Sequence, residues 1–345
     1  MKAIVQGEYG IGGVLEFKDI DQPEIADDEV LVRVHAAGVD RGVWHMMTGL
    51  PYFLRLIIPD LGLRTPKNPV PGSDVAGVVE AIGKDVSRFK PGDEVFGVGK
   101  GSYAEYARAL ENKLAPKPAN ITFEQAAVVP ISGLSALQAV RDAGKVSLGQ
   151  KILIIGASGG VGTYAVQIAK SFGAHVTGVC STAKVDLVRS LGADHVIDYT
   201  VENFTDRGER YDVILDTGGH SSLSHLRSAL TPKGTVVIVG AETGGKWFGG
   251  FDRSIRAALL SRFVDQQLIA FVNSENHVDM LALKELIELG KSHADHRQVV
   301  FAERSSSGHE LSHRGTRSGK NRHICLAAGK QQRDLRIRSD IEIHL

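Results

Sequence analysis

The chain has 345 residues, enough for two domains that each bury a core. Its 40 basic residues balance 40 acidic ones, so no charge excess points to nucleic acid or an anionic membrane as a partner. The start, Met1-Lys2-Ala-Ile-Val-Gln, lacks the apolar core of a signal peptide, and no 18-residue apolar run occurs. Two cysteines exclude a disulfide framework and a four-cysteine zinc lobe. We therefore expect a soluble protein of the reducing cytoplasm that does not span a membrane.

Residues 1 to about 110 are predicted to be rich in β-structure. Apolar and polar residues alternate over 29–35 and 75–81, which is typical of strands that end at Gly or Pro turns. Pro91-Gly-Asp-Glu-Val-Phe96 indicates a tight turn before another short strand. Residues 52–70 are apolar and interrupted by prolines, which predicts a long loop. Loops of this length are usually functional or mobile.

From about residue 125, strands alternate with helical patterns. Strands are predicted at 151–156, 175–180, 195–198, 212–216 and 235–240. A helix is expected to open at Gly160, and another to run from Met280 to Leu289. This alternation predicts an α/β fold with a doubly wound parallel sheet.

A glycine-rich turn joins the first of these strands to the helix behind it. Ala157, Gly159 and Gly162 have the i, i+2, i+5 spacing of dinucleotide-binding loops, with Ala in place of the first Gly. Backbone N–H groups and a positive helix N-terminus at such a loop bind pyrophosphate. The predicted cofactor-binding residues of the loop are Ala157, Ser158, Gly159, Gly160, Val161 and Gly162.

Three ordered blocks resemble the medium-chain dehydrogenase/reductase superfamily. They are Pro71-Gly-Ser-Asp-Val-Ala-Gly77, Pro91-Gly-Asp-Glu-Val95 and Ala157-Ser-Gly-Gly-Val-Gly162. The last block is similar to that of the quinone oxidoreductase branch. The resemblance implies a GroES-like β domain over residues 1–124 and a Rossmann cofactor domain over 125–270. It also implies a helix at 271–290 that returns to the first domain.

The resemblance to the zinc-containing members fails at their metal ligands. Those members carry Cys, His and a later Cys or His, where this chain has Asp40, Ser73 (followed by Asp74) and Ile131. A catalytic zinc needs three converging N, S or O ligands from the protein. We therefore expect no zinc, so that hydrogen bonds or solvent must stabilise developing negative charge.

Cofactor choice is indicated at the end of the second Rossmann strand. NAD-specific members carry an acidic residue there, whereas this chain continues Cys180-Ser181-Thr182-Ala-Lys184. Ser181 and Lys184 are suited to bind a 2′-phosphate, and the resemblance adds Tyr199 as a further contact. The alternative is that Ser181 only caps the next helix and Lys184 is solvated. We expect NADPH in preference to NADH.

The resemblance also implies contacts around the nicotinamide. Ser135 matches a family hydroxyl beside the ring, although a helix serine can simply bond its own backbone. Gly240 and Ala241 follow the fifth strand, where family backbone groups hold the carboxamide. The alternative for this pair is an ordinary turn.

Asp40 and Tyr52 are the candidate catalytic residues. Asp40 could orient the substrate or relay a proton, and it could equally cap a turn. The branch usually carries Asn there, with an Asp three residues later where this chain has Val43. Tyr52 is the better proton donor by resemblance. Trp44 and His45 are expected to pack, with His45 as an alternative acid.

After Gly290 the periodic pattern ends. Residues 291–345 hold six of the thirteen histidines and eight arginines, with no sustained helical or strand period. The family instead ends with a Thr-Pro-x-x-Asp-Arg strand, an amphipathic helix and a Gly-His-Ala-Arg-Gly-Lys-Val-type strand.

Codons permitted for this segment restore that ending when they are read one base out of register. From His293 they give Thr-Pro-Ile-Ile-Asp-Arg-Ser-Tyr-Ser-Leu-Ser. From Ser312 they give Tyr-Leu-Ile-Glu-Gly-His-Ala-Arg-Ala-Lys-Thr-Val-Ile. Both match the expected ending in order and spacing. We predict a one-base shift near codon 291, which makes 291–345 an aberrant tail.

Taken together, the sequence predicts a zinc-independent, NADPH-dependent reductase. It would pass hydride to a small-molecule quinone or α,β-unsaturated carbonyl between the two domains, as the resemblance implies. Two alternatives remain: an alcohol/carbonyl dehydrogenase, or a cofactor-binding protein whose catalysis is impaired by the altered C-terminus. Family members commonly dimerise, so the resemblance also implies a homodimer.

Overall fold

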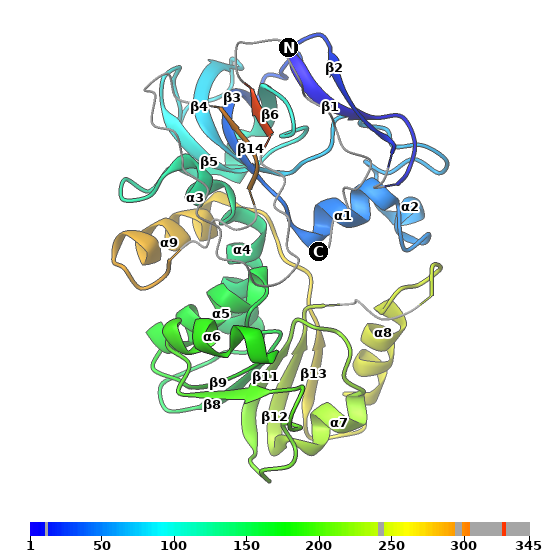
Figure 1. Cartoon of the computed structure of the whole chain (residues 1–345), viewed down its shortest axis with the longest axis vertical. Helices are drawn as coiled ribbons and strands as arrows, with labels where there is room; N and C mark the ends of the chain where they lie inside the picture. Colours follow the sequence, from blue (N-terminus) through cyan, green and yellow to red (C-terminus); the bar gives the residue numbers. More distant parts are fainter. Residues whose placement is uncertain (11–12, 241–244, 294–298, 304–325, 329–345) are drawn as a thin grey trace.

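The structure, a computed structural model, describes residues 1–10, 13–240, 245–293, 299–303 and 326–328. In Figure 1 an antiparallel β domain lies above a parallel α/β domain, with the helices α3, α4 and α9 at the junction. The predicted fold class is confirmed by this arrangement. No helix in these described ranges is both long and apolar enough to cross a membrane.

The upper domain is built on a seven-stranded sheet. Its main path runs β15-β14-β3-β4-β5-β7, and β6 pairs with the other part of β3. A separate antiparallel pair joins β1 (Lys2–Gln6) to β2 (Leu15–Asp19). The strands of the larger sheet are β3 (Glu29–Gly38), β4 (Asp74–Ile82), β5 (Glu94–Val98), β6 (Tyr106–Leu110), β7 (Leu114–Pro116), β14 (Val299–Glu303) and β15 (Leu326–Ala328).

The segment between β3 and β4 contains helices that the sequence prediction did not include. α1 (Arg41–Thr48) begins where the Asp40 side chain accepts a hydrogen bond from Val43 N, and it ends at Gly49 with φ of 60°. α2 (Leu54–Ile57) is a single turn within the predicted loop 52–70. The rest of that loop is irregular, as predicted.

The lower domain holds a six-stranded parallel sheet in the order β10-β9-β8-β11-β12-β13. This is the 3-2-1-4-5-6 order of dinucleotide-binding sheets, with the crevice at the carboxyl ends of β8 and β11. The five predicted strands are present and β13 is an addition. The strands are β8 (Lys151–Ile155), β9 (His175–Cys180), β10 (His195–Asp198), β11 (Tyr211–Asp216), β12 (Leu230–Ile238) and β13 (Gln267–Ala270).

Helices cover both faces of this sheet. The main ones are α5 (Gly160–Ser171), α6 (Val185–Ser190), α7 (Leu223–Ser228) and α8 (Phe251–Leu260). α9 (His277–Glu288) begins three residues before its predicted start, and the side chain of its N-cap residue Asn276 accepts from Asp279 N at 2.9 Å. A short α3 (Phe123–Ala127) precedes α4 (Pro130–Gln138), which leads from the first domain into the second.

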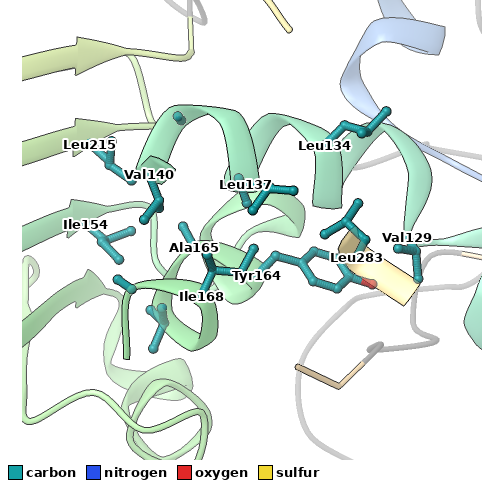
Figure 2. Close-up of a cluster of buried hydrophobic side chains, with 14 of the residues drawn as sticks. Val129, Leu134, Leu137, Val140, Ile154, Tyr164, Ala165, Ile168, Leu215 and Leu283 are labelled. Carbon is teal, nitrogen blue, oxygen red and sulfur yellow. The ribbon is translucent and has the colours of Figure 1, made fainter. Parts of the chain in front are cut away.

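One apolar core joins the two domains through α4 and α5. Figure 2 shows Leu137, Ile168 and Leu215 from α4, α5 and β11 within one buried cluster, and Leu283 of α9 belongs to the same cluster. Each such side chain contributes about 1.5–3 kcal/mol when fully buried. α4 is thereby held as a rigid element between the domains.

A buried polar network fixes α4 against α9 as well. Gln138 Nε2 donates to Asp279 Oδ2 and to Ser274 O, both at 2.7 Å. Arg141 forms an ion pair with Asp279 at 2.7 Å. At the other end of α9, Ala119 N donates to Glu288 Oε1 at 3.1 Å, so the helix also contacts the first domain.

The predicted tail, 291–345, lies mostly outside the described residues. Of it, the structure describes residues 291–293 and the backbones of two strands, β14, which pairs antiparallel with β3 near Gly38, and β15, which runs parallel to β14. The frame shift stays a prediction.

Candidate cofactor and active site

The glycine-rich loop forms a tight turn between β8 and α5. Gly156 has φ of +79°, and its carbonyl oxygen accepts a hydrogen bond from Gly159 N at 2.9 Å. Gly156 N and Ala157 N both donate to Val179 O on β9, at 3.1 and 3.0 Å. The turn is therefore anchored to the neighbouring strand and does not depend on a ligand for its shape.

The alanine at the first glycine position is accommodated by a second glycine on β9. Ala157 is fully buried, and a Cβ added at Gly178 would lie 3.0 Å from the Ala157 methyl group and 2.5 Å from Val188. Gly178 thus leaves the space that the alanine side chain uses. The sequence pattern gave no sign of this compensation because Gly178 lies in another strand.

The N-terminus of α5 offers backbone donors at the crevice. Gly159 is its N-cap residue, and no described side chain caps it. The N–H groups of Gly160, Val161 and Gly162 are in the first turn, where a helix provides no acceptor. A Cβ at Gly159 would meet only the Gly156 carbonyl oxygen, at 3.3 Å. These features fit the pyrophosphate of a dinucleotide.

Two alanine substitutions in this loop should separate folding from binding. A Cβ at Gly162 would overlap the Gly156 carbonyl and lie 2.8 Å from Ala157 Cα. We expect Gly162→Ala to lower the free energy of unfolding by about 2 kcal/mol or more. Gly159→Ala should change it by less than about 1 kcal/mol, yet weaken NADPH binding about tenfold, since its methyl group blocks close approach of a phosphate. Urea unfolding and NADPH titration measure the two effects. Equal losses of stability in both variants would contradict this division of roles.

The residues predicted to bind a 2′-phosphate gather at the ends of β9 and β10. Lys184 N donates to Ser181 O at 2.8 Å and closes a short turn, in which the Ser181 side chain makes no capping hydrogen bond. Tyr199 N donates to Cys180 O at 3.1 Å, and its side chain is 64% exposed. Ser181, Lys184 and Tyr199 thus share one corner of the sheet, at the carboxyl ends of β9 and β10.

A carboxylate that the sequence reasoning did not consider lies at the same corner. Asp198 ends β10 opposite Cys180, and its Oδ1 accepts from Thr200 N at 2.9 Å and from Thr200 Oγ1 at 2.7 Å. A hydrogen bond from Thr182 and those from Thr200 hold the pKa of Asp198 below its usual value. The carboxylate is thus bound by neighbouring hydroxyl groups.

Gly240, which is predicted to help hold the nicotinamide carboxamide, follows β12, and its N–H donates to Asp216 O at the end of β11 at 3.0 Å. A side chain at Gly240 would overlap the Thr217 carbonyl, so the backbone must approach closely there. Ala241 lies outside the described residues. Asp216 is fully buried at the end of β11 and forms an ion pair with Arg253 of α8. In the sequence, the only signal that could have identified Asp216 is its place at the end of a buried apolar strand.

The first domain contributes a pair of buried carboxyl groups. Asp40 Oδ1 accepts from Val43 N at 3.1 Å, whereas Oδ2 is buried and has no hydrogen-bond partner among the described residues. Asp74 is 1% exposed, and its Oδ1 accepts from Ile131 N at 3.1 Å. Asp40 therefore does cap a turn, as one of the two alternatives proposed. Ile131 N is the first-turn donor of α4, four residues before the buried Ser135.

Burial gives these acids unusual pKa values. Desolvation is the main cause that raises the pKa of Asp40 to about 6, and the charge of Glu275 adds to it. Desolvation also raises the pKa of Asp74 well above its usual range, and the charge of Asp40 raises it further. Tyr103, whose hydroxyl donates to Gly38 O at 3.2 Å, has a raised pKa for the same reasons. Sequence reasoning named Asp40 but missed the partner role of Asp74.

The remaining candidates lie on α1 and on the loop that follows it. His45 Nδ1 and Leu50 O are 2.7 Å apart, and the His45 ring is edge-on to Trp44, so His45 of α1 packs against both its helix neighbour and the following loop. Tyr52 meets Trp247 from the lower domain. No three His, Cys, Asp or Glu side chains in the described part of the chain are grouped as metal ligands.

Comparison with known families agrees with this architecture. The family described as "Alcohol dehydrogenase GroES-like domain" matches residues 26–119, and "Zinc-binding dehydrogenase" matches residues 160–259. Human quinone oxidoreductase is 34% identical over 251 residues, which cover 70% of this chain and 73% of that protein. The quinone oxidoreductase structure from Coxiella burnetii has a TM-score of 0.71 and 26% identity, and the match covers 84% of this chain and 88% of that one.

Two further relatives match over a smaller share of their own length. The 2-methylene-furan-3-one reductase of Solanum lycopersicum is 37% identical, and the match covers 69% of this chain and 65% of the relative. The mitochondrial NAD(P)H oxidoreductase RTN4IP1 of Mus musculus is 40% identical, with 64% and 60% covered. The chain thus spans less than two thirds of these two relatives. With two matched domains, the expected sheet order and the human relative, the chain belongs to the medium-chain dehydrogenase/reductase superfamily, in its quinone oxidoreductase-like branch.

Proposed function

We propose that the chain is a zinc-independent, NADPH-dependent reductase of quinones or α,β-unsaturated carbonyls. The observation that carries this proposal is the phosphate-binding loop beside a β9 turn that has Ser181 and Lys184 where NAD enzymes carry a carboxylate. When bound, NADPH supplies a hydride from C4 of its nicotinamide. The names of the human and tomato relatives, a quinone oxidoreductase and a methylene-furanone reductase, support the two acceptor classes.

The residues at the positions where zinc-containing members carry their metal ligands support catalysis without zinc. Asp40 Oδ1 caps α1, and one oxygen of Asp74 accepts from Ile131 N. The side chain of Ile131 offers no ligand atom at all. Metal analysis of the purified protein should find less than about 0.1 zinc per chain. Stoichiometric zinc, together with NADP⁺ reduction by alcohols, would favour the alcohol dehydrogenase alternative.

Lys184→Gln tests the cofactor assignment. Loss of one charge–phosphate contact should weaken NADPH binding about tenfold and leave NADH binding within about twofold, because only NADPH carries the 2′-phosphate. The assay follows NADPH oxidation at 340 nm with a naphthoquinone and with but-3-en-2-one, beside fluorescence titration of both cofactors. Lys233→Gln, at an exposed lysine in β12, is the control. Equal effects on NADPH and NADH would contradict the phosphate role.

The same assay separates the enzyme from a cofactor-binding protein. If the chain binds NADPH but no acceptor oxidises the bound NADPH, the result would support the alternative of a cofactor-binding protein whose altered C-terminus impairs catalysis. We also propose a homodimer, which sedimentation equilibrium tests, and a reducing cytoplasmic compartment, which the two cysteines support. Imaging of the tagged chain tests that compartment against the mitochondrial location named for the mouse relative.

A further inference from the structure

A short aromatic bridge connects the two domains at the side opposite the α4–α9 junction. In Figure 1 the segment that leads into α8 rises from the lower domain to α2 of the upper one. Tyr52 N donates to Lys246 O at 2.8 Å, and Phe53 N donates to Trp247 O at 3.2 Å. The two segments therefore pair through their backbones, although they lie nearly 200 residues apart in the sequence.

Aromatic side chains from both segments gather along this pairing. The Tyr52 and Trp247 rings are 5.4 Å apart and nearly perpendicular, with 76° between their planes. Phe53 is edge-on to Phe251 at 4.8 Å and lies over Phe248 at 6.1 Å. We call these five residues the aromatic bridge.

One end of the bridge is held rigidly. The Arg55 guanidinium lies 4.8 Å from the Tyr52 ring and 4.0 Å from the Tyr9 ring, sandwiched as a cation between them. Arg55 Nε also donates to Gly49 O at 2.8 Å, which fixes the guanidinium to the end of α1. The ring of Tyr52 is therefore positioned before any ligand arrives.

The other end presents an open aromatic face. Trp247 is 69% exposed and Phe248 is 58% exposed, which is unusual for rings of this size. The Trp247 and Tyr52 rings meet edge to face. This contact covers only part of the indole, so indole surface remains on which a planar ring can stack. In the sequence Trp247 lies seven residues after Gly240, whose N–H donates to Asp216 O at the carboxyl end of β11, where sheets of this order have their crevice.

We propose that Trp247, positioned by Tyr52, stacks on a planar aromatic acceptor, and that it selects quinones of about naphthoquinone size over small aliphatic enones. This inference rests on the proposed reductase function and narrows its acceptor class. A flat, electron-poor quinone ring gains stacking energy on an indole, whereas a short enone has no ring to stack. Trp247 is thus a specificity residue, and Tyr52 and Arg55 position it.

Fluorescence tests this proposal without catalysis. The chain has two tryptophans, so in a Trp44→Phe background Trp247 is the sole indole reporter. Titration with 2-methyl-1,4-naphthoquinone in the absence of NADPH should quench it saturably, beyond the collisional quenching of N-acetyltryptophanamide. But-3-en-2-one should cause no saturable quenching. Collisional quenching alone would overturn the proposal.

Kinetics give the second readout. Trp247→Ala should lower kcat/KM for the naphthoquinone about tenfold, equal to about 1.4 kcal/mol, and change that for but-3-en-2-one less than twofold. Trp247→Phe should restore most of the loss, and Phe17→Ala, at an exposed ring of β2, is the matched control. Equal losses of kcat/KM with both acceptors would show that Trp247 only helps to hold the two domains together, and this result would overturn the proposal. Absence of NADPH oxidation with every acceptor, with quenching intact, would instead count against the reductase function.

Discussion

Asp40→Asn is expected to raise the free energy of unfolding at pH 8 by about 3 kcal/mol. The carboxyl group is buried, and in the described part of the chain one of its oxygens has no hydrogen-bond partner. Its pKa is raised from 3.8 to about 6 in the folded chain. Ionising it in the folded state therefore costs about 3 kcal/mol more than in the unfolded state. Asparagine keeps the oxygen that caps α1 and carries no charge. Its neighbour Asp74 also loses a repelling charge.

The pH dependence has a definite sign. Because the folded pKa of Asp40 is raised, the folded chain binds more protons than the unfolded one between about pH 3.8 and 6. The penalty in the natural chain is thus complete above about pH 6, and it fades as the pH falls toward 3.8. Urea unfolding at pH 8, 6 and 4.5 should show the gain from Asp40→Asn shrinking in that order.

A control variant separates the effect of burial from that of lost charge. Asp85→Asn removes an exposed carboxylate near the end of β4 and should change stability by less than about 0.5 kcal/mol at every pH. A gain from Asp40→Asn that does not vary with pH, or a loss at pH 8, would contradict the argument.

The same variant decides between the two roles considered for Asp40. If the carboxyl group only caps α1, Asp40→Asn keeps its turnover, because asparagine caps a helix equally well. If it relays a proton to the substrate, turnover falls by about 100-fold while NADPH affinity is unchanged. Stability and activity therefore report on different properties of this one side chain.

Much of the fold was predictable because its signals are local. Buried parallel strands are apolar runs, and the first of them ends at the glycine-rich turn of residues 156–162, which opens a helix. β13 was missed because Gln267-Leu-Ile-Ala270 is only four residues long and follows no turn signal. α1 was missed because Asp40, its cap, was considered chiefly as a counterpart of a metal ligand.

The rest of the site depends on contacts between distant segments. Gly178 makes room for Ala157 only because β9 packs beside β8. Asp74 becomes a partner of Asp40 only when β4 brings it to the N-terminus of α4. The aromatic bridge joins segments from two domains, and neither segment alone has a pattern that indicates the other. Local sequence reasoning could identify such residues, but it could not pair them.

Restoring the reading frame near codon 291 is expected to raise the Tm by about 10 °C or more. The restored ending contains the strand and amphipathic helix that the family implies, with five or six large apolar side chains worth about 1.5–3 kcal/mol each when buried. That gross gain of about 10 kcal/mol is partly offset by the entropy of ordering the segment. A net gain of about 3 kcal/mol would already shift the Tm by this amount in a domain of 150–250 residues.

The C-terminal segment returns to the first domain close to the candidate active site. β14 pairs with β3 at Ala36 to Gly38. β3 ends two residues before Asp40, and its partner strand β4 begins at Asp74. A frame-restored chain should therefore bind NADPH as the present chain does, because the lower domain precedes the shift. It should also turn over quinone about tenfold faster, since the first domain would gain the apolar side chains of the restored helix and strand. Equal melting temperatures of the two chains would contradict the shift, and so would a gene sequence with no alternative frame that encodes the family ending.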